Sequence, residues 1–180
     1  MAFRGLFIGL DRYAHAAVNQ LSCAARDASA LHALFTDNFG DGAQLLTNDT
    51  ATRQGIVDGL AALSNAARDD VVVIAFSSHG SPTHELIPVD ADPFDLARTA
   101  VSLDTLTELV SAVPARVVLC ILDCCFSGGA GAKVLSLPVA ARGVADGTAD
   151  ERLAVSGHQV GARRLIGGRP PSALWRRRVL

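Results

Sequence analysis

Three short apolar runs constrain the fold of this chain more than any other feature of its sequence. They are GLFIGL at residues 5–10, DVVVIAF at 70–76 and RVVLCIL at 116–122. Each run is nearly continuous instead of alternating between apolar and polar residues, which is typical of strands buried on both faces of a parallel sheet. A shorter run, AQLLT at 43–47, indicates a further strand.

The segments between these runs have the periodicity of amphipathic helices. Residues 22–40 carry apolar side chains at i, i+3 and i+4 spacing, with Ser22 as a candidate N-cap. Residues 50–67 repeat this pattern, and a third helix is expected from Ser102 until just before Pro114. Strands that alternate with helices of this length predict βαβ units. We therefore expect an α/β fold with a mostly parallel sheet and helices on both faces.

The composition favours one domain outside the membrane. The chain has 180 residues, of which 49% are hydrophobic, so it can build its own core. A formal net charge of −2 gives no electrostatic reason to expect nucleic acid or an anionic membrane as partner. No run reaches the length of a membrane span, and the N-terminus lacks a signal-peptide core, so we expect a cytoplasmic protein. The chain has four cysteines, Cys23, Cys120, Cys124 and Cys125. They show neither the paired spacing of a zinc site nor the density of a secreted disulfide-rich protein.

Polar residues follow each of the three long apolar runs. Because ligands bind beyond the carboxyl ends of parallel strands, Asp11, residues 77–80 and residues 123–129 are expected to share one rim of the sheet. On this rim His79 follows one run and Cys125 follows the next. An imidazole near a thiol can act as its base or stabilise the thiolate, which predicts a nucleophilic cysteine site.

Other catalytic motifs do not fit the cysteine segment. GGAGAKV at 128–134 lacks the Gly-Lys-Ser/Thr of a phosphate-binding loop, and no arginine stands where a cysteine phosphatase needs one. No Cys-x-x-Cys redox pair is present. Cys120 is better interpreted as a small buried hydrophobe, and His79 alone could be an ordinary loop histidine. A His-Gly motif and an Asp-Cys-Cys-x-Ser-Gly motif follow successive predicted strands, and this combination favours a catalytic role.

The segments FSSHGS (76–81) and LDCCFSGG (122–129) resemble the histidine and cysteine motifs of the caspase-like cysteine peptidases, most closely the bacterial metacaspase-like branch. The resemblance runs from about residue 4 to about residue 132. It implies a three-layer α/β/α sandwich and a protein or peptide substrate. Three further segments also resemble the family pattern: LFIGLDRY (6–13), LSCAARDASAL (21–31) and LIPVDAD (86–92).

The resemblance implies a role for each matching residue. His79 would be the general base and Cys125 the nucleophile, with the backbone N–H groups of Gly80 and Cys125 forming the oxyanion hole. Metacaspases cleave after Arg or Lys, and the matching acidic residues of the specificity pocket are Asp27 and Asp123. Carboxylates suit the recognition of a guanidinium. For Asp27, a solvated helix face is an alternative interpretation. The alternative for the whole chain is a catalytically inactive caspase-like module that binds another protein.

The C-terminal region departs from the rest of the chain. We expect residues 1–139 to form the peptidase domain, equivalent to the large-subunit portion of the family. We expect residues 140–180 to be a linker and an atypical basic tail that packs loosely, because no periodic apolar pattern follows residue 140. The C-terminal part of the fold is therefore expected to be incomplete, and a partner protein would supply the small-subunit portion.

No cofactor is required by the sequence. Metacaspases often need calcium, and PVDADPFD at 88–95 offers carboxylates. Their spacing matches no cation-binding loop, so an acidic surface loop is the better interpretation.

Overall fold

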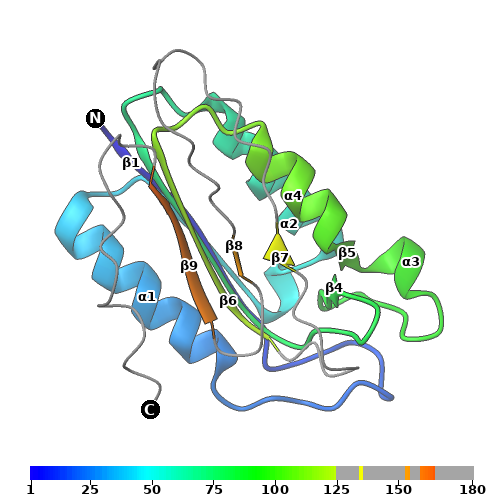
Figure 1. Ribbon diagram of the computed structural model, residues 1–180. Coiled ribbons are helices and arrows are strands. Elements are labelled where there is room, and N and C mark those ends of the chain that lie inside the picture. Colours follow the sequence, from blue (N-terminus) through cyan, green and yellow to red (C-terminus); the bar gives the residue numbers. More distant parts are fainter. Residues whose placement is uncertain (125–133, 136–152, 155–158, 165–180) are drawn as a thin grey trace.

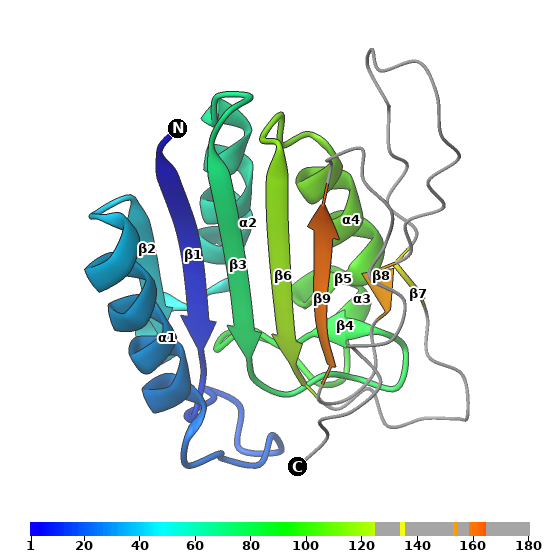
Figure 2. The ribbon, with the colours of Figure 1, turned by 60° about the vertical axis from the view of Figure 1, so that its left-hand side comes forward.

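A five-stranded sheet with the strand order β2-β1-β3-β6-β9 forms the centre of the protein (Figures 1 and 2). The computed structural model describes residues 1–124, 134–135, 153–154 and 159–164. The first four strands are parallel to their neighbours, and the last is antiparallel to β6. The α/β fold with a mostly parallel sheet is thus confirmed. The five strands are β1 (Phe3–Gly9), β2 (Ala43–Thr47), β3 (Val71–Ser77), β6 (Val117–Asp123) and β9 (Gln159–Arg164).

Helices cover both faces of this sheet and make three layers. Helix α1 (Ala24–Phe39) lies on one face, and α2 (Arg53–Ala62) and α4 (Leu103–Ser111) lie on the other (Figure 1). Short elements complete the described fold: the 3-10 turns Asn48–Thr50 and Leu63–Asn65, helix α3 (Leu96–Thr99), and the two-stranded pairs β4 (Glu85–Leu86) with β5 (Val101–Ser102) and β7 (Val134–Leu135) with β8 (Leu153–Ala154).

The continuous apolar runs are explained by these two helical layers. Along β6, Val118, Cys120 and Leu122 belong to the core cluster that includes α2 and α4. Leu119 and Ile121 pack instead against the smaller cluster beneath α1. Successive side chains of a strand point to opposite faces, so a strand covered on both faces needs apolar residues at every position.

Helix α1 begins differently from its prediction. Its N-cap is Cys23, and the Oδ1 atom of Asp11 accepts the N–H of Ala24 at 2.7 Å, so the predicted cap at Ser22 is wrong. The reason lies in close packing: a Cβ added to Gly9 would lie 2.4 Å from the Ala24 carbonyl oxygen. The chain that leaves β1 therefore passes close to the N-terminus of α1, where Asp11 accepts its N–H group.

Helix α4 begins where the sequence predicts a helix, directly after Ser102. The Ser102 hydroxyl accepts the Thr105 N–H at 3.0 Å at the start of α4. Helix α2 begins in the same way, because Thr52 Oγ1 accepts the Gly55 N–H at 3.1 Å. Each of these side chains satisfies one of the N–H groups that the first turn of a helix leaves without a partner.

Part of the predicted tail lies in the sheet. Residues 159–164 form β9, which pairs antiparallel with β6 in a register that places Gln159 opposite Leu122 and Arg164 opposite Val117. The sequence predicts no sheet strand there, because no periodic apolar pattern follows residue 140. Residue 139, the predicted domain boundary, lies outside the described residues, so the boundary stays a prediction. Among the described residues, no helix has the length and apolar composition needed to cross a bilayer.

Candidate active site

The predicted rim is present at the carboxyl ends of β1, β3 and β6 (Figure 2). The strand register places Ser77 between Gly9 and Asp123. Two backbone hydrogen bonds continue the pairing beyond the strands: Leu10 N–H donates to Ser77 O at 3.0 Å, and Ser78 N–H donates to Asp123 O at 3.3 Å. The residues that leave these strands therefore start from fixed positions.

His79 is half-buried on this rim and is held from one side by the loop that follows β1. Its backbone N–H donates to the Tyr13 hydroxyl at 3.0 Å, and the two rings lie 5.2 Å apart between centroids. Its Nε2 atom lies 2.8 Å from the carbonyl oxygen of Asn19. A carbonyl only accepts hydrogen bonds, so Nε2 carries the hydrogen and Nδ1 is the basic nitrogen of the neutral ring.

The N–H group of Gly80 is directed by a short hairpin. Gly80 and Leu86 form an isolated antiparallel bridge, flanked by Ile87 N–H to His79 O at 3.1 Å and Ser81 N–H to Glu85 O at 2.9 Å. In such a pair the N–H and C=O of the facing residues point away from each other. Within residues 1–124, no acceptor takes the Gly80 N–H. This donor is therefore positioned without being used by the hairpin.

The side chains of Ser81, Thr83 and Glu85 stabilise this hairpin. Both hydroxyls donate to the Glu85 carboxylate, that of Thr83 at 2.7 Å, and the Glu85 N–H donates back to Ser81 Oγ at 3.0 Å. His84 adopts a φ of 69°, in the left-handed region that non-glycine residues rarely occupy. The turn after His79 is thus closed by its own side chains.

Of the two adjacent cysteines, Cys124 and Cys125, only the first lies in the described part of the chain. Cys124 is 3% exposed and belongs to the core cluster that contains Leu122 and Cys120. Burial raises the pKa of the Cys120 thiol to about 12, as expected for an apolar core position. Cys125, the predicted nucleophile, lies outside the described residues. Its pairing with His79 and its oxyanion-hole N–H therefore stay predictions.

The two predicted specificity carboxylates lie on the same side of the sheet. Asp27 is exposed in the first turn of α1, with its carboxylate 3.7 Å from Arg26 Nε. Asp123 is exposed at the end of β6, at the same strand parity as Leu119 and Ile121, which face α1. Both carboxylates are thus on the α1 side and open to solvent.

The role of Tyr13 was missed by the sequence analysis, which quoted the residue only as part of a family segment. Tyr13 is 7% exposed, and its burial raises the pKa of the phenol, an effect that the His79 N–H partly opposes by hydrogen bonding to its oxygen. Its position two residues after Asp11, on the predicted rim, is the sequence signal that could have indicated this role. Asn19 contributes only a backbone carbonyl, which the identity of its side chain cannot reveal.

The acidic segment 88–95 uses its carboxylates locally. Asp90 accepts the Arg53 N–H at 2.8 Å, Asp92 accepts the Phe94 N–H at 2.9 Å, and Asp95 lies 2.7 Å from Arg98 Nε. No group of three or more His, Cys, Asp or Glu side chains suited to a metal ion occurs in the described part of the chain.

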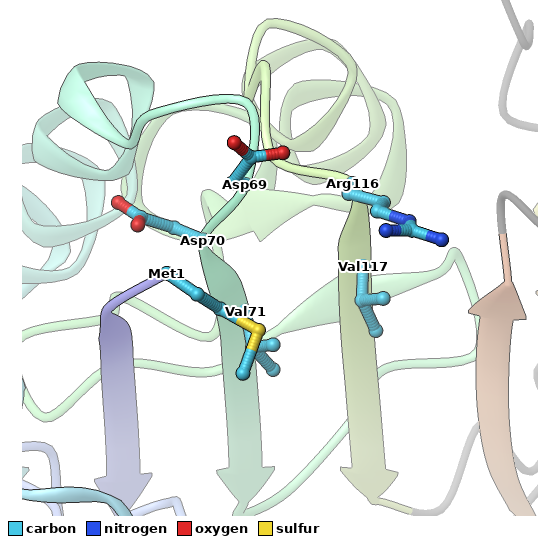
Figure 3. Close-up of a pocket in the computed structure, with 6 residues that line it drawn as sticks. All are labelled: Met1, Asp69, Asp70, Val71, Arg116 and Val117. Atoms are coloured by element: carbon cyan, nitrogen blue, oxygen red, sulfur yellow. The ribbon is translucent and has the colours of Figure 1, made fainter.

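A pocket of about 350 Å³ lies at the amino ends of β3 and β6, where the Met1 side chain extends toward Val71 (Figure 3). His79 follows β3 at its carboxyl end, so the pocket and the histidine lie at opposite ends of this strand. The Asp70 carboxylate beside this pocket is already hydrogen-bonded, because it accepts the N–H groups of Ala2 and Ala67 at 2.8 and 2.9 Å. The pocket is separate from the rim. Its lining residues are Met1, Asp69, Asp70, Val71, Arg116 and Val117.

Comparisons with known proteins agree with this arrangement. The sequence profile of the caspase domain matches residues 4–162. The crystal structure of protein GSU0716 from Geobacter sulfurreducens is similar, with 22% sequence identity and a TM-score of 0.58 over 72% of this chain and 52% of that one. The chain thus spans about half the length of that protein, whose likeness shows the fold. No match was found among curated proteins. Because the profile covers most of its length, the chain belongs to the caspase-domain family.

Proposed function

We propose that this protein is a cysteine-type endopeptidase that acts through a His79–Cys125 dyad. One observation carries the proposal. Strands β3 and β6 are paired so that Ser77 lies opposite Asp123, and His79 and Cys125 are each the second residue after these partners. The histidine is held with Nδ1 as its basic nitrogen on the rim that the cysteine strand also reaches.

The chemistry follows from these groups. Nδ1 of His79 removes the thiol proton, and the Cys125 sulfur attacks the carbonyl carbon of the substrate peptide bond. The N–H groups of Gly80 and Cys125 donate to the oxyanion that forms. The intermediate collapses to a thioester as the amine leaves with the proton from His79. Water, deprotonated by His79, then hydrolyses the thioester and releases the acid product and the thiol.

The substrate class follows from the two carboxylates on the α1 side of the rim. Asp27 and Asp123 are both exposed, so a cationic side chain can reach them, and Asp27 also lies 3.7 Å from Arg26 Nε. A metacaspase-like preference for Arg or Lys before the cleaved bond is therefore proposed. The protein would act in the cytoplasm on protein or peptide substrates, without nucleic acid or a membrane as partner. No cofactor takes part in these steps, and a calcium requirement is not part of the proposal.

The dyad is tested with the two neighbouring cysteines as a matched pair. Cys125→Ala and His79→Ala should each lower kcat/KM for a peptide substrate by about 10³-fold or more. Cys124→Ser, which changes a core position, should leave most of the activity. In the wild-type protein an alkylating reagent should label Cys125 fastest, and His79→Ala should slow this labelling. Activity that survives in Cys125→Ala but not in Cys124→Ser would reverse the assignment.

Specificity is tested with fluorogenic peptides that differ only before the cleaved bond. Peptides with Arg or Lys should be cleaved and those with Asp should not. Asp123→Asn should lower kcat/KM by about 10- to 100-fold, the usual effect of losing a charged hydrogen bond, and Asp27→Asn should lower it less. Turnover of the Asp peptide at an equal rate would refute the acidic pocket.

The alternative function is a catalytically inactive caspase-like module that binds another protein. This alternative shares the caspase-domain assignment with the first proposal. In it, the module is inactive alone and a partner protein supplies the small-subunit portion. No peptide turnover, together with a Cys125 thiol that reacts no faster than free cysteine, would favour this alternative.

A further inference from the structure

The loop between β1 and α1, residues 10–23, is fixed to the rest of the rim by its backbone. The N–H of Leu21 donates to Asp11 O at 2.8 Å, which closes the loop on itself. The N–H of Ala14 donates to Val89 O at 2.9 Å. The N–H groups of Asp11 and Arg12 donate to the Asn48 side-chain oxygen at 2.9 and 3.0 Å. A loop held in this way can position a catalytic group.

Tyr13 is the side chain through which this loop holds His79. Its hydroxyl accepts the His79 backbone N–H at 3.0 Å and donates to the Leu10 carbonyl at 3.4 Å. Its ring packs against the imidazole at 5.2 Å between centroids and an interplanar angle of 33°. One buried side chain therefore restrains both the backbone and the ring of the histidine.

Gln20 holds Tyr13 in turn. Its side-chain oxygen accepts the Tyr13 N–H at 3.0 Å, and its NH₂ group donates to the Tyr13 carbonyl at 3.4 Å. The preceding residue, Asn19, contributes the carbonyl that lies 2.8 Å from His79 Nε2. The Gln20 amide therefore ties together the two parts of the loop that contact the imidazole.

We propose that Tyr13 and Gln20 are positioning residues for His79 in the proposed peptidase. They hold the imidazole with Nε2 toward Asn19 and Nδ1 free to serve the cysteine. Tyr13 contacts the backbone N–H and the ring of His79, and Gln20 contacts Tyr13, so their effect is exerted through His79. This assignment rests on the proposed function, because it gives the histidine its catalytic task.

The test compares variants of the full chain. Tyr13→Phe removes only the hydroxyl, Tyr13→Leu removes the ring contact as well, and Gln20→Leu removes the amide. Thr107→Val is the matched control, since it removes a side-chain hydrogen bond of 2.7 Å to Leu103 O in α4, away from the rim. Thermal unfolding followed by circular dichroism identifies the temperature at which all variants are folded, and all rates are measured there.

Tyr13→Phe and Gln20→Leu should each lower kcat for an Arg peptide by about 10-fold with KM unchanged, the effect of about one hydrogen bond. The rate of Cys125 alkylation should fall to a similar extent. Tyr13→Leu should lower both rates further, whereas Thr107→Val should change neither. Wild-type values of both rates in Tyr13→Phe and Gln20→Leu would overturn the positioning role while leaving the peptidase proposal intact.

A readout that needs no activity separates the two proposals. The imidazole nitrogen signals of His79 in NMR spectra should show the hydrogen on Nε2 in the wild-type protein, and this preference should weaken in Tyr13→Phe and Gln20→Leu. Unchanged signals in both variants would overturn the positioning role. A wild-type protein that shows the expected tautomer and its loss in the variants, but cleaves no peptide, would refute the peptidase proposal alone.

Discussion

Tyr13 carries its own optical probe, because it is the only tyrosine in the chain. Burial raises the pKa of its phenol above the ordinary value of about 10. The near-ultraviolet absorption of tyrosinate should therefore appear in the folded protein only at a pH above that value. Denaturation in urea should return the midpoint to about 10. A folded protein that titrates like the denatured chain would show that the phenol is open to water.

The contacts of Asp70 predict how the stability of the protein depends on pH. Its carboxylate accepts N–H groups from Ala2 and Ala67 and lies 3.3 Å from Arg4 Nε, and these contacts lower its pKa. A pKa lowered by folding means that the carboxylate stabilises the fold above its unfolded pKa of about 3.9, and that this contribution is lost as the pH falls through the folded pKa.

Asp70→Asn should therefore have a lower free energy of unfolding than the wild-type protein at pH 7, and the difference should shrink below about pH 4. Urea unfolding at several pH values measures this difference. Asp69→Asn, at an exposed neighbouring position, is the control and should change little. A difference between Asp70→Asn and wild type that does not vary with pH would contradict the assignment to the carboxylate.

At the scale of elements, the long strands and helices could be predicted because periodicity reports burial on one face or on both. The N-cap of α1 could not, because its partner Asp11 comes from the end of β1, and only tertiary packing brings the two together. The short pair β4–β5 and helix α3 carry too few residues for any period to be visible.

The difference between these caps can be measured. Asp11→Ala should destabilise the protein by about 1 kcal/mol, and Ser102→Ala by a similar amount, because each leaves a helix N–H group without its acceptor. Ser22→Ala should change stability by less than about 0.5 kcal/mol, since within the described residues its hydroxyl contacts only the Cys23 sulfur at 3.8 Å. Chemical denaturation gives all three values. A larger loss in Ser22→Ala than in Asp11→Ala would restore the cap predicted from the sequence.

At the scale of the molecule, β9 decides whether β6 is an inner strand or an edge. In a strand with neighbours on both sides, alternate N–H groups donate to either neighbour. Because β9 pairs with β6 from Val117 to Leu122, amide hydrogen exchange should be slow throughout these residues. Exchange that alternates between slow and fast residues along β6 would show that only β3 is paired with it.

Only part of the candidate site on the rim could be predicted from the sequence. The position of His79 and Gly80 after a buried strand could be predicted, and the strand order confirms that β3 and β6 are neighbours. The groups that orient the imidazole could not be predicted. Tyr13 acts on a backbone N–H and Asn19 acts through its carbonyl, so neither contact depends on a spacing that the sequence displays.

The strand order also has a consequence for synthesis on the ribosome. Chains emerge N-terminus first, so β1, α1 and β2 can associate before the other strands exist. The loop that holds His79 is therefore made before the histidine arrives with β3, and its anchors at Asn48 and Val89 are both made before residue 125. Strand β6, which leads to the proposed nucleophile, is the last of the parallel strands to be added. A nascent chain thus completes the support for the proposed general base before it can present the proposed nucleophile.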